Sequence, residues 1–122
     1  MKARELMIGD WVELYGTPTR WKLEDYAKWH KEMERTDVHT FEPIPLTPEI
    51  LEKNGFNKAG EIMPYTYRES KELKSLIQIF TNFGNFDCHI VSKNFDADMR
   101  LSYVHELQHA LKLCGIDKQI IL

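Results

Sequence analysis

The sequence predicts an α+β fold, in which a mostly antiparallel sheet carries two or three helices packed on it. Three runs rich in aromatic and β-branched residues follow one another at PYTYR, SLIQIFT and FDCHIVS, and such runs are typical of strands. Two other stretches, around residues 47–55 and 102–114, carry the start and stop signals of helices. The order of these elements along the chain favours an antiparallel sheet.

Length and composition indicate one folded unit. The chain has 122 residues, so we expect a single domain spanning 1–122 that could include an N-terminal subregion at 1–42. No apolar run approaches the roughly 20 residues of a membrane span, and the first residues lack the apolar stretch of a signal peptide. We therefore expect a cytoplasmic protein without membrane contact, in which Cys88 and Cys114 are reduced, buried thiols.

The N-terminal part predicts one strand and one helix. Residues 5–15 alternate loosely around a Gly-Asp turn and predict a strand, which the Gly-Thr-Pro at 16–18 closes. From Leu23 to about Arg35 apolar positions recur at threes and fours, which is the period of a helix. The opening also resembles the first strand of small SH3-like barrels.

The stretch FEPIPLTPEILEKNGF specifies a short helix at both of its ends. Its first prolines hold the chain extended before the helix. Thr47 is suited to the N-cap, and Pro48 suits the first turn because its missing N–H is not needed there. Gly55 can adopt the left-handed conformation that ends a helix, which lets Phe56 fold back on it.

The second half of the chain predicts a hairpin, a helix and a last strand. NFGN at 82–85 separates two strand-like runs at a length suited to a hairpin. NFDAD at 94–98 predicts a polar break between elements. A helix is expected from Ser102 to Cys114, where Gly115 ends it, and IDKQIIL predicts a closing strand.

The final predicted helix contains the sequence HELQH, which matches a zinc-binding pattern of many hydrolases. His105 and His109 lie four residues apart, so on a helix both could bind one zinc ion. Glu106 would lie beside them as the general base. One alternative for the function is therefore a zinc-dependent hydrolase with His105 and His109 as metal ligands and Glu106 as the catalytic residue.

Two observations favour a coincidental match on a surface helix. At about 100° per residue the apolar side chains gather on one arc, and both histidines fall on the opposite side, as on a solvated face. A zinc site also needs a third ligand. Gly115 occupies the position where one group of zinc hydrolases places a third histidine, Asp117 is the one carboxylate after His109, and nothing in the spacing selects His89. We therefore expect no metal, no cofactor and no catalytic residue.

The charge pattern points to a protein partner. The formal net charge is −3, and acidic and basic residues alternate, whereas proteins that bind the phosphate backbone usually carry a basic stripe. We expect a protein partner and no nucleic acid. The sequence leaves the oligomeric state and the identity of the partner open.

Three motifs resemble a family of short uncharacterised proteins of gut anaerobes, their phages and their mobile elements. They are ELMIGDWV at 5–12, PIPLTPEILEKNGF at 43–56 and the last helix with its following segment at 103–122. Members of that family often read His-Gln-Leu-Gln at the last helix, so Glu106 departs from the pattern. The resemblance implies an origin and a domain organisation, but no activity, cofactor or substrate.

The expected function is that of a small non-enzymatic accessory protein that binds another protein. Small size, a mixed-charge surface, many aromatic residues and the lack of a complete catalytic set all favour it. The resemblance adds a phage or mobile-element setting, in which an anti-defence or host-modulating role would fit.

Overall fold

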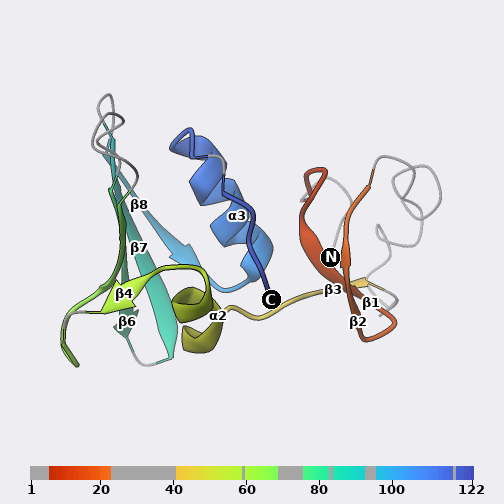
Figure 1. Cartoon of the computed structure of the whole chain (residues 1–122), viewed down its shortest axis with the longest axis horizontal. Coiled ribbons are helices and arrows are strands. Elements are labelled where there is room, and N and C mark those ends of the chain that lie inside the picture. The colour runs from red at the N-terminus through yellow and green to blue at the C-terminus, as the bar shows by residue number, and fades with distance from the viewer. Residues whose placement is uncertain are drawn as a thin grey trace. The chain divides into compact units, whose positions relative to one another are not determined.

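The structure is a computed structural model that describes residues 6–22, 41–58, 60–68, 76–82, 84–92, 96–116 and 118–122 (Figure 1). The predicted α+β class is confirmed, because the described residues form two antiparallel sheets with eight strands, accompanied by two helices. The chain divides into two compact units, Met1–Pro45 with Tyr103–His105 and Leu46–Ser102 with Glu106–Leu122. The helix predicted at 23–35 lies outside the described residues. None of the described helices has the length and apolar character needed to cross a membrane.

The first unit contains a three-stranded sheet with the order β2-β1-β3. Its strands are β1 (Trp11–Leu14), β2 (Thr17–Arg20) and β3 (Phe41–Pro43). The first strand ends before Gly16 as predicted, but Thr17 and Pro18 already belong to β2, because Tyr15 and Gly16 make a two-residue turn between the two strands. Both turn residues have positive φ, as tight hairpins require. Pro18 fits into β2 because this is an edge strand.

The second unit contains a five-stranded sheet with the order β4-β5-β6-β7-β8. Its strands are β4 (Asn57–Lys58), β5 (Tyr65–Arg68), β6 (Leu76–Asn82), β7 (Asn85–Val91) and β8 (Asp96–Leu101). The three predicted strands of this region are confirmed as β5, β6 and β7. The predicted break at 94–98 is wrong from Asp96 onward, because these residues begin β8 and pair with β7. Charged residues at alternate positions of β8 gave this strand the appearance of a loop.

Two helices lie on one face of this sheet, α2 (Pro48–Lys53) and α3 (Val104–Leu113) (Figure 1). The hydrophobic core lies between them and the sheet. Fully buried side chains come from the facing strands and from both helices; they include Ile77, Ile79, Ile90, Leu51, Leu107 and Leu111.

Both predicted ends of α2 are confirmed. The Thr47 hydroxyl accepts a hydrogen bond from the backbone N–H of Ile50 (3.3 Å), and Pro48 occupies the first turn. Gly55 has φ +86°, the left-handed conformation expected after a helix. The N–H groups of Gly55 and Phe56 then return to carbonyls of the last helical turn. The sequence therefore specifies this helix by local chemistry at both ends.

The closing strand predicted at IDKQIIL is wrong for its described residues, 116 and 118–122, which join no sheet. The buried side chain of Asn54 takes the place of a neighbouring strand. Its Oδ1 accepts a hydrogen bond from the Ile121 N–H (2.7 Å), and its Nδ2 donates to the Ile121 carbonyl (2.7 Å). The Lys53 ammonium also donates to the Leu122 carbonyl. One side-chain amide therefore fixes the end of the chain to the end of α2.

The caps of α2 give a stability prediction. Thr47→Ala removes the acceptor for the Ile50 N–H and should lower the free energy of unfolding by about 1 kcal/mol. Gly55→Val should cost more, about 2 kcal/mol, because a β-branched side chain resists positive φ. Urea denaturation measures both changes, with Thr47→Ser as the control that keeps a capping hydroxyl. Parent-like stability in both destabilising variants would contradict the assigned helix ends.

Candidate functional site

The zinc-like motif lies in the first half of α3, and its first histidine is not on a solvated face as the sequence predicts. His105 is only 6% exposed, and its ring stacks on Tyr103 with the ring centroids 5.9 Å apart. An extended segment after β3 lies beside the start of this helix. Pro45 pairs with Tyr103, and the Val104 N–H donates to the Ile44 carbonyl (2.8 Å). Helical periodicity does not reveal that a distant segment binds the start of this helix.

Glu106, the candidate general base, has a structural partner in the chain. Its Oε1 accepts a hydrogen bond from the backbone N–H of Ser102 (2.9 Å), just before the helix begins. A glutamate in the first turn that reaches back in this way satisfies a donor that the helix cannot. A carboxylate near a helix N-terminus is also favoured by the helix dipole. The Glu106 side chain thus caps α3.

His109, the second candidate ligand, is half-buried one turn farther along α3. It lines a groove beside β8 together with Met99, Leu101 and Leu113. In the part of the chain that the structure describes, no three His, Cys, Asp or Glu side chains come together in a group that could hold a metal ion. Asp117, one possible third ligand, lies outside the described residues.

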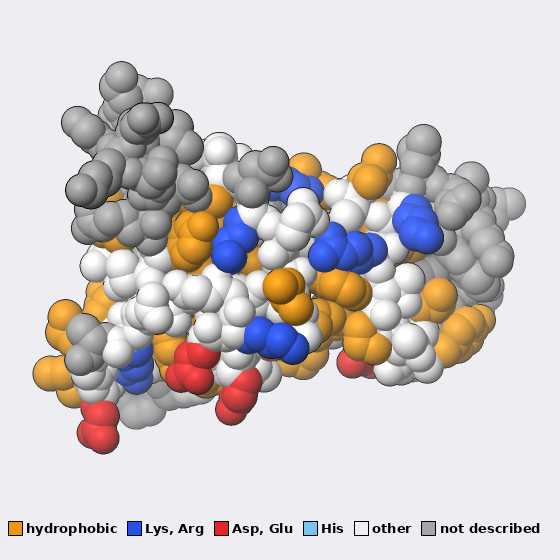
Figure 2. Space-filling model, in the orientation of Figure 1, with side chains coloured by type: hydrophobic (Ala, Val, Ile, Leu, Met, Phe, Trp, Pro, Cys, Tyr) orange, Lys and Arg blue, Asp and Glu red, His pale blue; other side chains and the backbone are white. Residues whose placement is uncertain are grey.

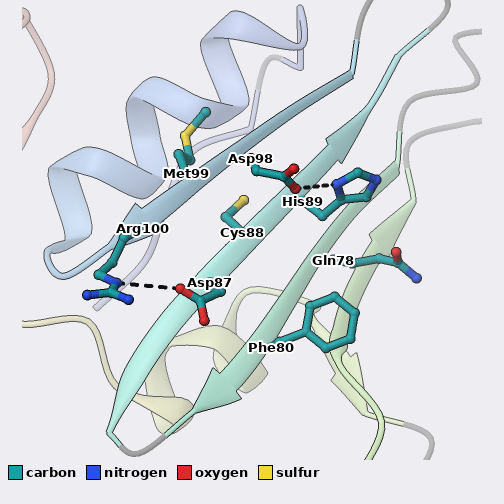
Figure 3. Close-up of a pocket in the computed structure, with 8 residues that line it drawn as sticks. All are labelled: Gln78, Phe80, Asp87, Cys88, His89, Asp98, Met99 and Arg100. Atoms are coloured by element: carbon teal, nitrogen blue, oxygen red, sulfur yellow. Dashed lines mark hydrogen bonds and ion pairs between the residues drawn. The ribbon is translucent and has the colours of Figure 1, made fainter.

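A second group of polar side chains lies away from this motif, on the face of the five-stranded sheet opposite α2 and α3. We call this surface the outer face and define it by six residues from three neighbouring strands: Gln78, Phe80, Asp87, His89, Asp98 and Arg100 (Figure 3). In Figure 3 the sheet is seen from this side, with α3 behind it. These side chains surround a shallow hollow of about 640 Å³.

Strand register brings these residues together in two rows. One row joins Gln78 of β6, His89 of β7 and Asp98 of β8, and the other joins Phe80, Asp87 and Arg100 in the same strand order. Directly opposed residues of antiparallel strands have neighbouring side chains. The outer face is therefore formed by pairing across strands that the sequence separates.

Each row contains one basic side chain that contacts an acidic side chain of the neighbouring strand. His89 Nδ1 lies 2.5 Å from Asp98 Oδ1, within hydrogen-bonding distance. Arg100 Nε donates to Asp87 Oδ1 at the longer distance of 3.5 Å. Both pairs are exposed to solvent, so each contributes little to stability. The two pairs instead hold their polar groups in defined directions around the exposed ring of Phe80.

Cys88 and His89 lie on opposite faces of β7. Alternation along β7 buries the Cys88 side chain in the core and places His89 on the outer face. Burial raises the pKa of the Cys88 thiol to about 12, which keeps it protonated at neutral pH and unsuited to act as a nucleophile. Cys114 is only half-buried, so its predicted full burial is wrong, although burial still raises its pKa.

Basic side chains do not form a continuous stripe on the face of the molecule seen in Figure 2. The Lys and Arg side chains described there stand apart from one another, separated by apolar and uncharged surface. The absence of a nucleic-acid partner nevertheless stays a prediction.

Comparison of the chain with protein-family models, with curated proteins and with solved structures finds no match in any of the three. The resemblance of the three sequence motifs to proteins of gut anaerobes and their phages, and that of the opening strand to SH3-like barrels, therefore stay predictions.

Few signals in the sequence point to the outer face. In the sequence His89 is a possible third zinc ligand, and Asp98 falls within the polar break predicted at 94–98. The alternation of Ala97, Met99 and Leu101 with charged residues would have identified β8, since a period of two is the mark of a half-buried strand.

Proposed function

We propose that this protein acts without catalysis, by binding another protein through the outer face of the five-stranded sheet. The observation that carries the proposal is the composition of that face. An exposed aromatic ring, Phe80, lies beside two cross-strand charge pairs around a shallow hollow, and both helices of the unit lie on the opposite face.

The ring of Phe80 would be the apolar anchor of the interface. It is 42% exposed on a strand with neighbours on both sides, so its position is held by the sheet. Binding would remove this ring from water, and aromatic residues and arginine are enriched in the cores of protein interfaces. Arg100 lies in the same row of the sheet and would provide the second anchor.

The charged pairs would select the partner. His89 with Asp98 and Asp87 with Arg100 present both signs of charge within a short distance. A complementary surface therefore needs an apolar side chain for the hollow, together with polar groups of both signs around it. Such a pattern belongs to a folded protein surface more than to a phosphate backbone of uniform charge.

The proposal also includes the biological setting in which the protein acts. The resemblance of the sequence motifs supports an accessory protein of a phage or mobile element that acts in the cytoplasm, by countering host defences or modulating the host. This part of the proposal rests on association alone.

The zinc-dependent hydrolase is not the function that we propose. Its general base, Glu106, is engaged with the Ser102 backbone, and its first ligand, His105, is buried against Tyr103. A general base must reach the proton that it abstracts.

The proposal predicts that one protein is captured through the outer face. The immobilised chain should retain a single partner from a lysate of the encoding cell, and Phe80→Ser should reduce the retained amount at least about tenfold, the usual consequence of losing an interface anchor. Ile121→Ser is the matched control, because Ile121 is also exposed but belongs to the segment bonded to Asn54 at the end of α2, on the side of the helices. Equal capture by both variants, or loss only in the control, would refute the outer face as the binding surface.

A further inference from the structure

Strand β8 is the edge of the five-stranded sheet among the strands that the structure describes. It pairs with β7 over six residues and has no second described strand beside it. The side chains of Asp98 and Arg100 are 83% and 64% exposed. An edge strand of regular length presents a row of backbone N–H and C=O groups that another strand can pair with.

We propose that β8 pairs with β8 of a second copy of this chain, antiparallel and about a two-fold axis at Met99. The two five-stranded sheets would then continue into one. The occupant of the edge is identified by the order of charges along β8, which is complementary to itself in one register.

The register follows from direct counting. In an antiparallel pair centred on Met99, each Asp98 lies opposite the Arg100 of the other copy, which makes two pairs of opposite charge on the outer side. On the inner side Met99 lies opposite Met99, and Ala97 opposite Leu101, so apolar residues meet apolar residues. Opposite charges and apolar pairs in directly opposed positions stabilise a sheet.

Neighbouring registers of the β8 pair are less favourable, because they oppose like charges or exchange the faces of the strand. Centring the pair on Asp98 or on Arg100 places a charge directly opposite its own copy, and centring it on Ala97 places Asp96 opposite Asp98. A shift by one residue places Asp98 opposite Met99 and exchanges the two faces of the strand. The Met99 register is the one that has opposite charges in both outer pairs and no like charges opposed.

The inner side of the edge offers apolar surface to the same junction. A groove beside β8 is lined by Met99, Leu101, Ala110 and Leu113 together with Arg100, Glu106 and His109, and the Leu113 side chain of α3 is 56% exposed. A two-fold axis between the two β8 strands would bring this groove and its copy together on the helix side. Burial of Leu113 and of the exposed part of Met99 would add to the backbone pairing, since Leu101 and Ala110 are already buried.

Charges on edge strands commonly prevent pairing, so the signs matter here. A protective edge repels every approaching strand, usually through lysines or through charges that face inward. The charges of β8 face outward, and at positions 98 and 100 their signs alternate. Arg100 already contacts Asp87 through its Nε, but a guanidinium has five N–H donors and can serve a second carboxylate.

The inference goes beyond the proposed function, because it concerns strand pairing along the edge of the sheet, although Asp98 and Arg100 of β8 also belong to the outer face. A dimer would join two outer faces into a wider surface. It would form whether or not Phe80 binds a partner.

Analytical ultracentrifugation of the full chain tests the dimer over a concentration series that reaches the millimolar range. We expect the parent to form dimers. Asp98→Arg gives a copy with two arginines on the outer side, and Arg100→Asp gives a copy with two aspartates. Each variant alone should dissociate at least about tenfold more readily than the parent, because attraction becomes repulsion at both pairs.

A mixture of the Asp98→Arg and Arg100→Asp variants gives the most specific test of the register. Two arginines then face two aspartates across the axis, so the mixture should form a heterodimer although neither variant forms a homodimer. A parent that stays monomeric throughout, or variants that associate like the parent, would overturn the proposal. If a variant fails to fold, hydrogen exchange of the parent decides instead: the β8 amides should become more protected as the concentration rises, and unchanged protection would equally overturn it.

Discussion

Replacing Asn54 with leucine is expected to lower the free energy of unfolding by about 3 kcal/mol, the largest single effect of a polar substitution that we anticipate. Asn54 is 2% exposed, and its side chain makes three hydrogen bonds with backbone groups of Ile50 and Ile121. Each such bond contributes about 1 kcal/mol, and a buried group left unsatisfied costs more than the bond itself. Leucine has a similar volume, so lost packing would not explain the change.

Two controls separate the hydrogen bonds from other effects of substitution. Asn57→Ala removes an exposed asparagine bonded to the Gly55 carbonyl (3.2 Å) and should change stability by less than about 0.5 kcal/mol. Asn54→Asp keeps one acceptor but loses both donated bonds and adds a buried charge, so it should be at least as harmful as leucine. Urea denaturation gives all three values. A leucine variant as stable as the parent would show that the end of the chain is not fixed through Asn54.

Truncating Leu107 to alanine should cost about 2–5 kcal/mol through lost burial and a residual cavity. Leu107 has no exposed surface and lies in α3 at the core of the second unit. The matched variant is His109→Gln, two residues along the same helix, where the side chain is half-buried and lines a groove. We expect that variant to unfold within about 1 kcal/mol of the parent.

The comparison of Leu107→Ala with His109→Gln also tests whether His109 is a surface residue or a zinc ligand. If a zinc ion bound His109, its binding energy would be coupled to folding, and His109→Gln would destabilise the protein strongly in the presence of metal. Thermal melts of both variants, with and without added zinc, measure this. The reverse order of stability, with the histidine variant melting first and only zinc protecting the parent, would contradict the structural assignment of the motif.

Local features of the fold could be predicted from the sequence. Thr47, Pro48 and Gly55 act on groups within a few residues of themselves, so the ends of α2 follow from their chemistry alone. The strands β5, β6 and β7 were recognised because their aromatic and β-branched residues form uninterrupted runs. Their antiparallel pairing agrees with the short turn between β6 and β7.

Features that depend on distant parts of the chain could not be predicted. His105 is buried, and the segment that pairs with its neighbours Tyr103 and Val104 lies about 60 residues earlier in the chain. Residues 118–122 look like a strand but bond to the side chain of Asn54 instead of to a sheet. Both errors arise because periodicity reports the character of one element and not what packs against it.

The outer face was missed for the same physical reason. Its two rows exist only once the register of β6, β7 and β8 is fixed, and β8 itself was obscured by its charged positions. Read separately, Phe80, His89 and Arg100 are ordinary surface residues.

Site-specific photo-crosslinking tests the central claim, that a protein partner binds the outer face, most directly. A photoreactive phenylalanine analogue would be placed at Phe80 in one sample and at Ile121, on the side of the helices, in another. We predict that irradiation in the encoding cell links position 80 to one defined protein, that position 121 gives no such product, and that Arg100→Glu weakens the link at position 80. A product at position 121 alone, or no product at position 80 while the protein is folded, would contradict the account.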